Sequence, residues 1–349
     1  MDAKRELFLL GLFRSISIRA PDRIDQEEIL DINVWVEERN PGSISLSGGY
    51  NPSSEIFSFK SVRGTFGLNY NNLYGRNLRV STKARFGTEG NLYETILIEP
   101  WLVGDTIGTL RVFEDNLQEI GDITRARGGI ASLIKRLGVH NKFSVQYKYQ
   151  ELRQKKRELG TTVSSFGLAF HRDNRDHFFN PRNGHLNEFV IEYAGGLLSG
   201  ATSFIKVTTD QRFYQNVTDV VFANAIRLGF EKGLRNQVRL PSFERFRIGG
   251  GTTVRGYDEM SLGPLDEFGN HRGDVMFVFY TELRFPIYKL VGAVVFFDLG
   301  NVWDEPKNLN DLIKDIRVNR PWSAIGFGLR MDTVSVSYTH LTLPTSDLV

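Results

Sequence analysis

A glycine-rich stretch, residues 246–257, carries the side chain best suited to a specific polar interaction. Three consecutive glycines (249–251) precede a single arginine, Arg255, which is followed by Gly256 and Tyr257. Glycine allows sharp bends and close approach of the backbone, and a guanidinium presents a planar fork that matches a carboxylate. We therefore expect Arg255 to be held on a loop that folds into the interior of the protein.

Two acidic residues downstream are the expected partners of Arg255. Residues 274–285 and 290–299 each alternate as strands do, with one apolar face. Glu282 and Asp298 stand on the opposite faces of these segments, so neighbouring strands would direct both carboxylates into one interior. Two inward carboxylates require a cation or water, and Arg255 is a suitable cation. We call the candidate site the latch; its residues are Arg255, Gly256, Tyr257, Glu282 and Asp298.

Other chemistry that these residue types could support is poorly represented. The six histidines show no HExxH spacing, and the absence of cysteine removes a thiol nucleophile and a zinc ribbon. The three glycines lack the Gly-Lys-Ser/Thr of a phosphate loop. Glu282 and Asp298 could be imagined as an acid–base pair, but the nearby arginine favours a structural clamp. We expect no enzyme, no cofactor and no metal.

The composition limits the classes of partner and membrane segment. Among 349 residues, 43 Lys and Arg nearly balance 41 Asp and Glu, so no nucleic-acid partner is indicated. The longest apolar run, residues 290–297, is too short for a membrane helix. No secretory signal opens the chain. A membrane β-barrel stays open, because its alternating strands escape hydropathy windows.

Alternating segments separated by turn residues follow the break at Asn40-Pro41-Gly42. A soluble β-sandwich or propeller is the alternative, although no blade-length repeat is visible. Aromatic residues near many segment ends favour a transmembrane antiparallel β-barrel with an interfacial girdle. The predicted strands cover residues 43–51, 62–70, 78–86, 93–99, 106–114, 123–134, 142–150, 163–171, 185–194, 203–214, 220–230, 274–285, 290–299 and 322–331.

Five motifs in chain order resemble those of the BamA/TamA family of outer-membrane barrel-assembly proteins. They are Asp173-Asn174-Arg175-Asp176 with residues 180–184, Val254-Arg255-Gly256-Tyr257, Glu282-Leu283-Arg284-Phe285-Pro286, residues 296–303, and Gly326-Phe327-Gly328-Leu329-Arg330. Residues 2–38, with an expected helix over residues 2–12 and strands over 13–18 and 29–38, resemble the second half of the family's last α/β POTRA domain.

The resemblance implies a barrel of 16 strands, of which about 14 are present here, in a bacterial outer membrane. It assigns residues 1–41 to the end of the last POTRA domain, in the periplasm, and residues 42–333 to a truncated barrel. It implies that the Arg255 loop folds back into the lumen to meet Glu282 and Asp298. Residues 336–345 resemble a translated sequencing adapter, so we expect residues 334–349 to be a non-native tail.

The function implied is insertion or export of client proteins without ATP. We expect it to proceed by strand addition at a weak seam, because an opened seam exposes unpaired N–H and C=O groups. The partners implied are unfolded outer-membrane or secreted clients, outer-membrane lipids and assembly-complex subunits. A two-partner secretion transporter and a passive porin or surface antigen are the alternatives. The expected seam strand includes two glycines, which weaken strand pairing; its residues are Ser43, Ile44, Ser45, Leu46, Ser47, Gly48, Gly49 and Tyr50.

Overall fold

The computed structural model describes residues 11–19, 32–50, 62–87, 90–119, 122–154, 157–234, 244–266, 269–288, 291–306 and 308–331. The helix expected over residues 2–12 lies outside this part except for its last two residues. The expected tail, residues 334–349, lies wholly outside it.

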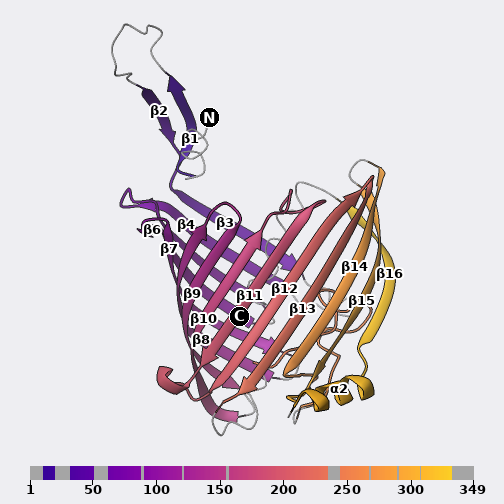
Figure 1. Cartoon of the computed structure of the whole chain (residues 1–349). Helices are drawn as coiled ribbons and strands as arrows, with labels where there is room; N and C mark the ends of the chain where they lie inside the picture. The colour runs from indigo at the N-terminus through magenta and orange to yellow at the C-terminus, as the bar shows by residue number, and fades with distance from the viewer. Residues whose placement is uncertain are drawn as a thin grey trace. The chain divides into compact units, whose positions relative to one another are not determined.

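Fourteen strands form a single sheet in which sequence neighbours are also spatial neighbours (Figure 1). The expected antiparallel sheet is therefore confirmed, and every predicted strand has its counterpart. Most strands are longer than predicted because the polar turns between them are short. The strands are β3 (Gly42–Tyr50), β4 (Val62–Leu73), β5 (Leu78–Gly87), β6 (Gly90–Val103), β7 (Thr106–Glu119), β8 (Asp122–Leu137), β9 (Asn141–Gln154), β10 (Arg157–Asp173), β11 (Gly184–Ala194), β12 (Phe204–Val217), β13 (Val220–Gly233), β14 (Val275–Tyr288), β15 (Val291–Trp303) and β16 (Trp322–Met331).

The chain divides into two compact units, of which the first holds residues 1–134 and 146–162. Here strand alternation separates an apolar face from a polar face, because paired residues of antiparallel strands share a side. The apolar face carries exposed side chains such as Ile44, Leu46, Phe66, Leu68, Tyr70, Phe86, Tyr93, Leu110 and Val112. The polar face carries Ser45, Asn69, Lys83, Arg85, Glu94 and Arg111.

The second unit, residues 135–145 and 163–349, repeats this division. Its apolar face exposes large side chains, among them Phe166, Phe170, Phe189, Phe213, Ile226, Phe230, Val295 and Phe327. Its polar face carries ion pairs between strands, such as Arg227 with Asp210 at 2.9 Å. A soluble protein rarely exposes so large an apolar surface, whereas a membrane strand directs such a face to lipid.

Smaller elements complete the described chain. β1 (Phe13–Arg19) and β2 (Asn33–Glu38) form an antiparallel pair, which confirms two strands there but not a POTRA domain. Sequence patterns did not predict α2 (Leu309–Val318), whose first turn is capped by the Asn308 side chain accepting from the Asp311 N–H. A short 3₁₀ turn, η2 (Gly196–Leu198), follows β11. In the described part of the chain, no helix has the length and apolarity needed to span a membrane.

The two faces predict opposite responses to the same added charge. Leu110 is exposed on the apolar face of β7, and its neighbour Thr109 pairs with Ile98 on the polar face. In vesicles, Leu110→Lys should lower the free energy of unfolding by about 2–4 kcal/mol if the residue lies near the bilayer midplane. Thr109→Lys is the matched control and should change it by less than about 1 kcal/mol. Urea titration of tryptophan fluorescence measures both, and equal losses would contradict the assignment of the faces.

Candidate functional site

Residues 244–266 and 269–274, in the segment between β13 and β14, form a loop that packs on the polar face of the second unit. We call it the docked loop. Three isolated antiparallel bridges shape its described residues, and they pair Phe246 with Gly273, Ile248 with Leu262, and Leu265 with His271. Its apolar side chains join two strand residues in a buried cluster of Phe246, Ile248, Val254, Leu262, Val278 and Val302. The loop is therefore a folded element with its own small core.

Ion pairs fix the base of the docked loop. The Arg245 guanidinium donates to both Asp274 oxygens, Nε to Oδ1 at 2.6 Å and Nη2 to Oδ2 at 2.9 Å, and also to Asp304. Lys206 of β12 donates to the Glu244 carbonyl at 2.5 Å and pairs with Glu231 at 3.3 Å. Except for Asp304, whose side chain is 47% exposed, these groups are largely buried, so each depends on its partner to offset the loss of water.

Arg255 binds Asp298 of β15 through three donors. Its backbone N–H and its Nε donate to Oδ2 at 3.0 and 2.7 Å, and its Nη2 donates to Oδ1 at 2.6 Å. The Asp298 side chain is 1% exposed, and that of Arg255 is 24% exposed. A carboxylate so fully removed from water needs this set of donors to remain charged.

The third guanidinium nitrogen of Arg255, Nη1, contacts Glu282 of β14. Nη1 donates to Oε1 at 2.6 Å. The other Glu282 oxygen accepts from Arg284 Nε at 2.9 Å and lies 3.9 Å from Nη1 of Arg330 on β16. The structure thus brings together the three charged residues expected from the sequence and adds two arginines around Glu282.

The Arg255 guanidinium stacks on an aromatic ring of the sheet. The guanidinium carbon lies 3.6 Å from the centre of the Phe296 ring, a close cation–π contact. That ring occupies the space above Gly326 of β16, where an added Cβ would stand 2.4 Å from Phe296 Cζ. Gly326 therefore leaves room for the platform on which Arg255 rests.

The two residues after Arg255 continue the contact with the sheet. Gly256 has a φ of 86°, a left-handed conformation that favours glycine. The Tyr257 hydroxyl donates to the Ser323 carbonyl of β16 at 3.0 Å, and its ring meets Trp322 edge-on at 5.7 Å. All five latch residues therefore take part in contacts or turns that bind the loop to β14, β15 and β16.

The charge state of Arg255 follows from these contacts. Partial burial disfavours the charged guanidinium, but the hydrogen bonds that it donates to Asp298 and Glu282 outweigh this effect and raise the pKa of Arg255 above its ordinary value. An arginine that stays charged at every physiological pH cannot serve as an acid or base. These contacts suit Arg255 to hold the loop by charge, and the role of the latch as a clamp stays a prediction.

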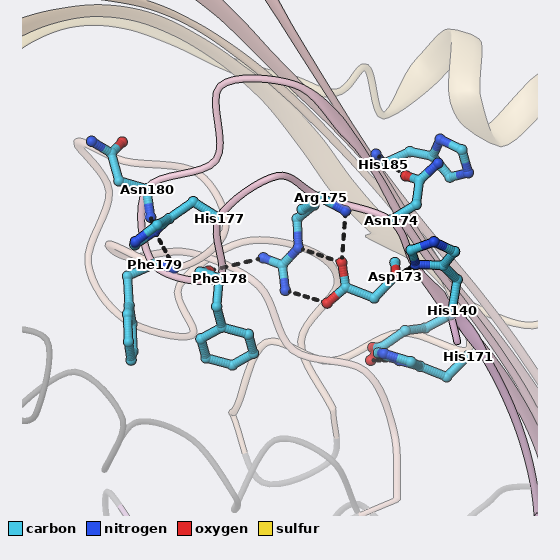
Figure 2. A network of polar contacts seen from close by, with 11 residues as sticks. His140, His171, Asp173, Asn174, Arg175, His177, Phe178, Phe179, Asn180 and His185 are labelled. Atoms are coloured by element: carbon cyan, nitrogen blue, oxygen red, sulfur yellow. Dashed lines mark hydrogen bonds and ion pairs between the residues drawn. The ribbon is translucent and has the colours of Figure 1, made fainter. Parts of the chain in front are cut away.

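A second polar network forms the turn between β10 and β11, in the Asp173-Asn174-Arg175-Asp176 motif (Figure 2). Arg175 donates Nε and Nη2 to the two Asp173 oxygens at 2.9 and 2.8 Å, and Nη1 to the Phe178 carbonyl at 3.3 Å. The hydrogen bond to Asp173 raises the pKa of Arg175. Asp176 accepts from the backbone N–H groups of Arg182 and Asn183. The motif therefore closes a turn.

Four histidines surround this turn in Figure 2 but do not converge on a common point. His140 Nδ1 lies 2.9 Å from the Asp173 carbonyl, and His171 Nδ1 lies 2.9 Å from Glu188. The His177 ring nitrogen accepts from the Asn180 N–H at 3.0 Å. Over the ranges described, no three His, Asp or Glu side chains are grouped so as to hold a metal ion.

The expected seam strand coincides with β3. It pairs with β4 from Gly42 opposite Tyr70 to Tyr50 opposite Val62. It stands last in the strand order, so β4 is its one neighbour among the described strands. Ile44 and Leu46 are 71% and 80% exposed.

Sequence reasoning missed several members of the site. Phe296, Arg284 and Arg330 lie within motifs singled out by the sequence, and alternation places each on the same face as Asp298 or Glu282. That signal could have found them. No local pattern links Arg245 to Asp274 and Asp304, which lie 29 and 59 residues away.

The family model described as the Omp85 superfamily domain matches residues 72–334, most of the chain. The chain belongs to the Omp85 superfamily. Its latch and its β10–β11 turn are thus features of an Omp85 protein.

Curated relatives of this Omp85 protein include outer membrane protein assembly factors. BamA of Nitratidesulfovibrio vulgaris (strain Hildenborough) is 27% identical over 321 residues, which cover 85% of this chain and 39% of the relative. BamA of Neorickettsia risticii (strain Illinois) is 24% identical, covering 86% of this chain and 42% of the relative. The chain spans about two fifths of the length of these relatives.

A solved structure with a similar fold is BamA from Haemophilus ducreyi lacking POTRA domains 1–3. It has a TM-score of 0.76 at 17% identity, covering 95% of this chain and 72% of that one. The 14-stranded sheet is therefore like that of the BamA barrel, as expected for a BamA/TamA-family fragment.

Removal of the Arg255 side chain tests the strength of the latch. Arg255→Ala leaves the buried Asp298 carboxylate without its main cation and should lower the free energy of unfolding by about 3–5 kcal/mol. Adding Asp298→Asn removes the orphaned charge and should recover part of the loss. Denaturant unfolding in micelles, with limited proteolysis of the loop, measures both variants. An unchanged midpoint and unchanged loop resistance in Arg255→Ala would contradict the analysis.

Two glycines on one face of β16 test the Phe296 platform. A methyl group at position 326 would meet Phe296 at 2.4 Å, whereas one at position 328 would meet Val294 at 3.4 Å. Gly326→Ala should therefore displace the ring, cost about 1–3 kcal/mol and increase proteolysis of the docked loop. Gly328→Ala is the matched control and should leave proteolysis unchanged. Equal resistance in the two variants would show that Arg255 does not depend on this ring.

Proposed function

We propose that this chain acts in the assembly or translocation of client proteins at a bacterial outer membrane, by adding a client strand to the edge of β3 that pairs with no described strand. The observation that carries the proposal is the position of β3 at the end of the strand order in an Omp85 protein. Support comes from curated relatives that are outer membrane protein assembly factors.

The chemistry of an unpaired edge explains how one strand could accept many clients. An edge strand presents a row of backbone N–H and C=O groups that can pair with any extended chain. In lipid, each unsatisfied backbone group costs several kcal/mol, so pairing is strongly favoured. Gly48 and Gly49 add no side chains that would select among clients. The bilayer supplies the driving force, and no ATP is required.

The latch has a supporting role in this proposal. Arg255 joins β14 and β15 directly, while Tyr257 adds β16 through the Ser323 carbonyl. These contacts hold three successive strands together under one loop. In the proposed mechanism they keep this part of the sheet intact while strand pairing changes elsewhere. Residues 1–41 would face the periplasm, where they would meet clients before insertion.

Export of a single secreted partner is the second candidate function. CdiB from Acinetobacter baumannii has a TM-score of 0.54 at 16% identity, covering 94% of this chain and 61% of that one. This likeness concerns the fold, and two-partner secretion would use the sheet as the wall of a conduit. A secretion transporter would engage its partner across the polar face, whereas an assembly factor would pair at an edge.

Disulfide cross-linking distinguishes edge pairing from passage, because the chain has no cysteine of its own. Ser45→Cys on β3 should cross-link to one register of a client's terminal strand during assembly. Ser81→Cys is the matched control and should not cross-link, because Ser81 is also on the polar face but lies on β5, which is paired on both sides. Cross-links of equal yield from both positions, spread along the client, would favour export through the interior.

A further inference from the structure

A group of charged residues interrupts the apolar face of the first unit near the ends of β7, β8 and β9. Arg125 of β8 pairs with Glu114 of β7, and Arg127 pairs with Glu151 of β9 through Nε and Nη2 at 2.8 and 2.6 Å. Arg153 follows on β9, and Arg125, Arg127, Glu151 and Arg153 line a hollow in the surface. We call Arg125, Arg127 and Arg153 the arginine cluster.

These side chains belong to the same face as the exposed apolar residues. Glu114 pairs with Tyr93 on β6 and alternates with Leu110 and Val112 along β7. Tyr93, Leu110 and Val112 are exposed. Arg125 contacts Glu114, so it shares that face. On β9, Tyr147 and Tyr149 alternate with Glu151. The face thus passes from aliphatic residues through tyrosines to charged groups along the strands.

This order fits an interface between lipid and water. An arginine on the lipid face costs about 2–4 kcal/mol at the midplane but only about 0–1 near the interface. Tyrosines mark the headgroup level in membrane proteins. The arginine cluster therefore lies at the depth of lipid headgroups rather than of acyl chains.

The strand order decides which leaflet this is. Only two residues separate β7 from β8 and three separate β8 from β9, so each pair turns back as a hairpin. Counting from Gly42, where residues 1–41 join β3, the cluster lies at the opposite end of the strands. If residues 1–41 are periplasmic, as the proposed function requires, the cluster faces the outer leaflet.

The cluster has unused capacity to bind an anion. Three arginines face two glutamates, which leaves an excess of positive charge. Each guanidinium carries five N–H donors, and the ion pairs use two from Arg127 and one from Arg125. Arg153 is exposed, and in the part of the chain that the structure describes its charge acts on Glu151 without a close ion pair. Arginine forks match phosphate oxygens in two-point contacts.

We propose that the arginine cluster binds a phosphorylated lipid headgroup of the outer leaflet on the lipid-facing surface of β7–β9. The acyl chains would lie along Leu110, Val112 and Leu133, and the phosphate would sit among Arg125, Arg127 and Arg153. This inference rests on the proposed membrane orientation. It assigns the outer face of these strands a lipid ligand in addition to bulk bilayer.

Native mass spectrometry of the whole chain in neutral micelles tests the inference, with a diphosphorylated glucosamine lipid as the probe. The chain should retain this lipid, and Arg127→Gln with Arg153→Gln should weaken retention about tenfold or more. Arg153→Gln alone breaks no ion pair among the described residues, so it should weaken retention several-fold even if the double variant folds poorly. Lys135→Gln, the same charge change farther along β8, should have no effect.

Three further measurements separate the alternatives. Removing the phosphates from the probe should abolish retention, and inorganic phosphate should not compete at concentrations near that of the lipid. The inference would be overturned if the parent chain retained the dephosphorylated lipid as well as the phosphorylated one. It would also be overturned if the arginine variants retained the phosphorylated lipid as well as the parent chain does. Client assembly in phosphatidylcholine vesicles, which lack anionic lipid, tests the proposed function separately. Loss of assembly with lipid retention intact would contradict strand addition and leave the lipid site standing.

Discussion

The buried carboxylate of Asp298 is the constraint around which this part of the fold is arranged. A charge with 1% exposure is costly unless donors replace the water it has lost. Arg255 supplies three of them, and it can do so only when the docked loop lies on the polar face. Asp298 of β15 therefore depends on the docked loop for the donors that replace its lost water. The Phe296 ring, which packs over Gly326, fixes the position of the guanidinium above the sheet.

The two ends of the strand order differ in how they are supported. A folded loop with its own apolar cluster covers β14, β15 and β16. β3 has β4 as its neighbour and exposes Ile44 and Leu46 on its apolar face. In the proposed function, charge and packing stabilise β14, β15 and β16. The backbone N–H and C=O groups at the edge of β3 remain available to a client strand. The arginine cluster would add a contact with the surrounding leaflet.

The strands and the charged core of the latch were accessible from the sequence because both depend on short-range periodicity. Alternation alone places Glu282 and Asp298 on the polar faces of adjacent strands, and it could equally have placed Phe296 and Arg330. The Arg245–Asp274–Asp304 contacts were not predictable, because they join residues across the docked loop through a fold of the backbone that no local pattern encodes. Helix α2 was missed although Asn308 and Asp311 form a capping signal.

The central claim is that charge, rather than the apolar cluster around Val254, holds the loop on the sheet. Spin labels at Asp258 on the loop and at Asp219 in the β12–β13 turn would report the distance between loop and strands in the second unit. We expect one narrow distance distribution in the parent chain and in Val254→Ala, and a broad distribution in Arg255→Ala. A narrow, unshifted distribution in Arg255→Ala would contradict this claim.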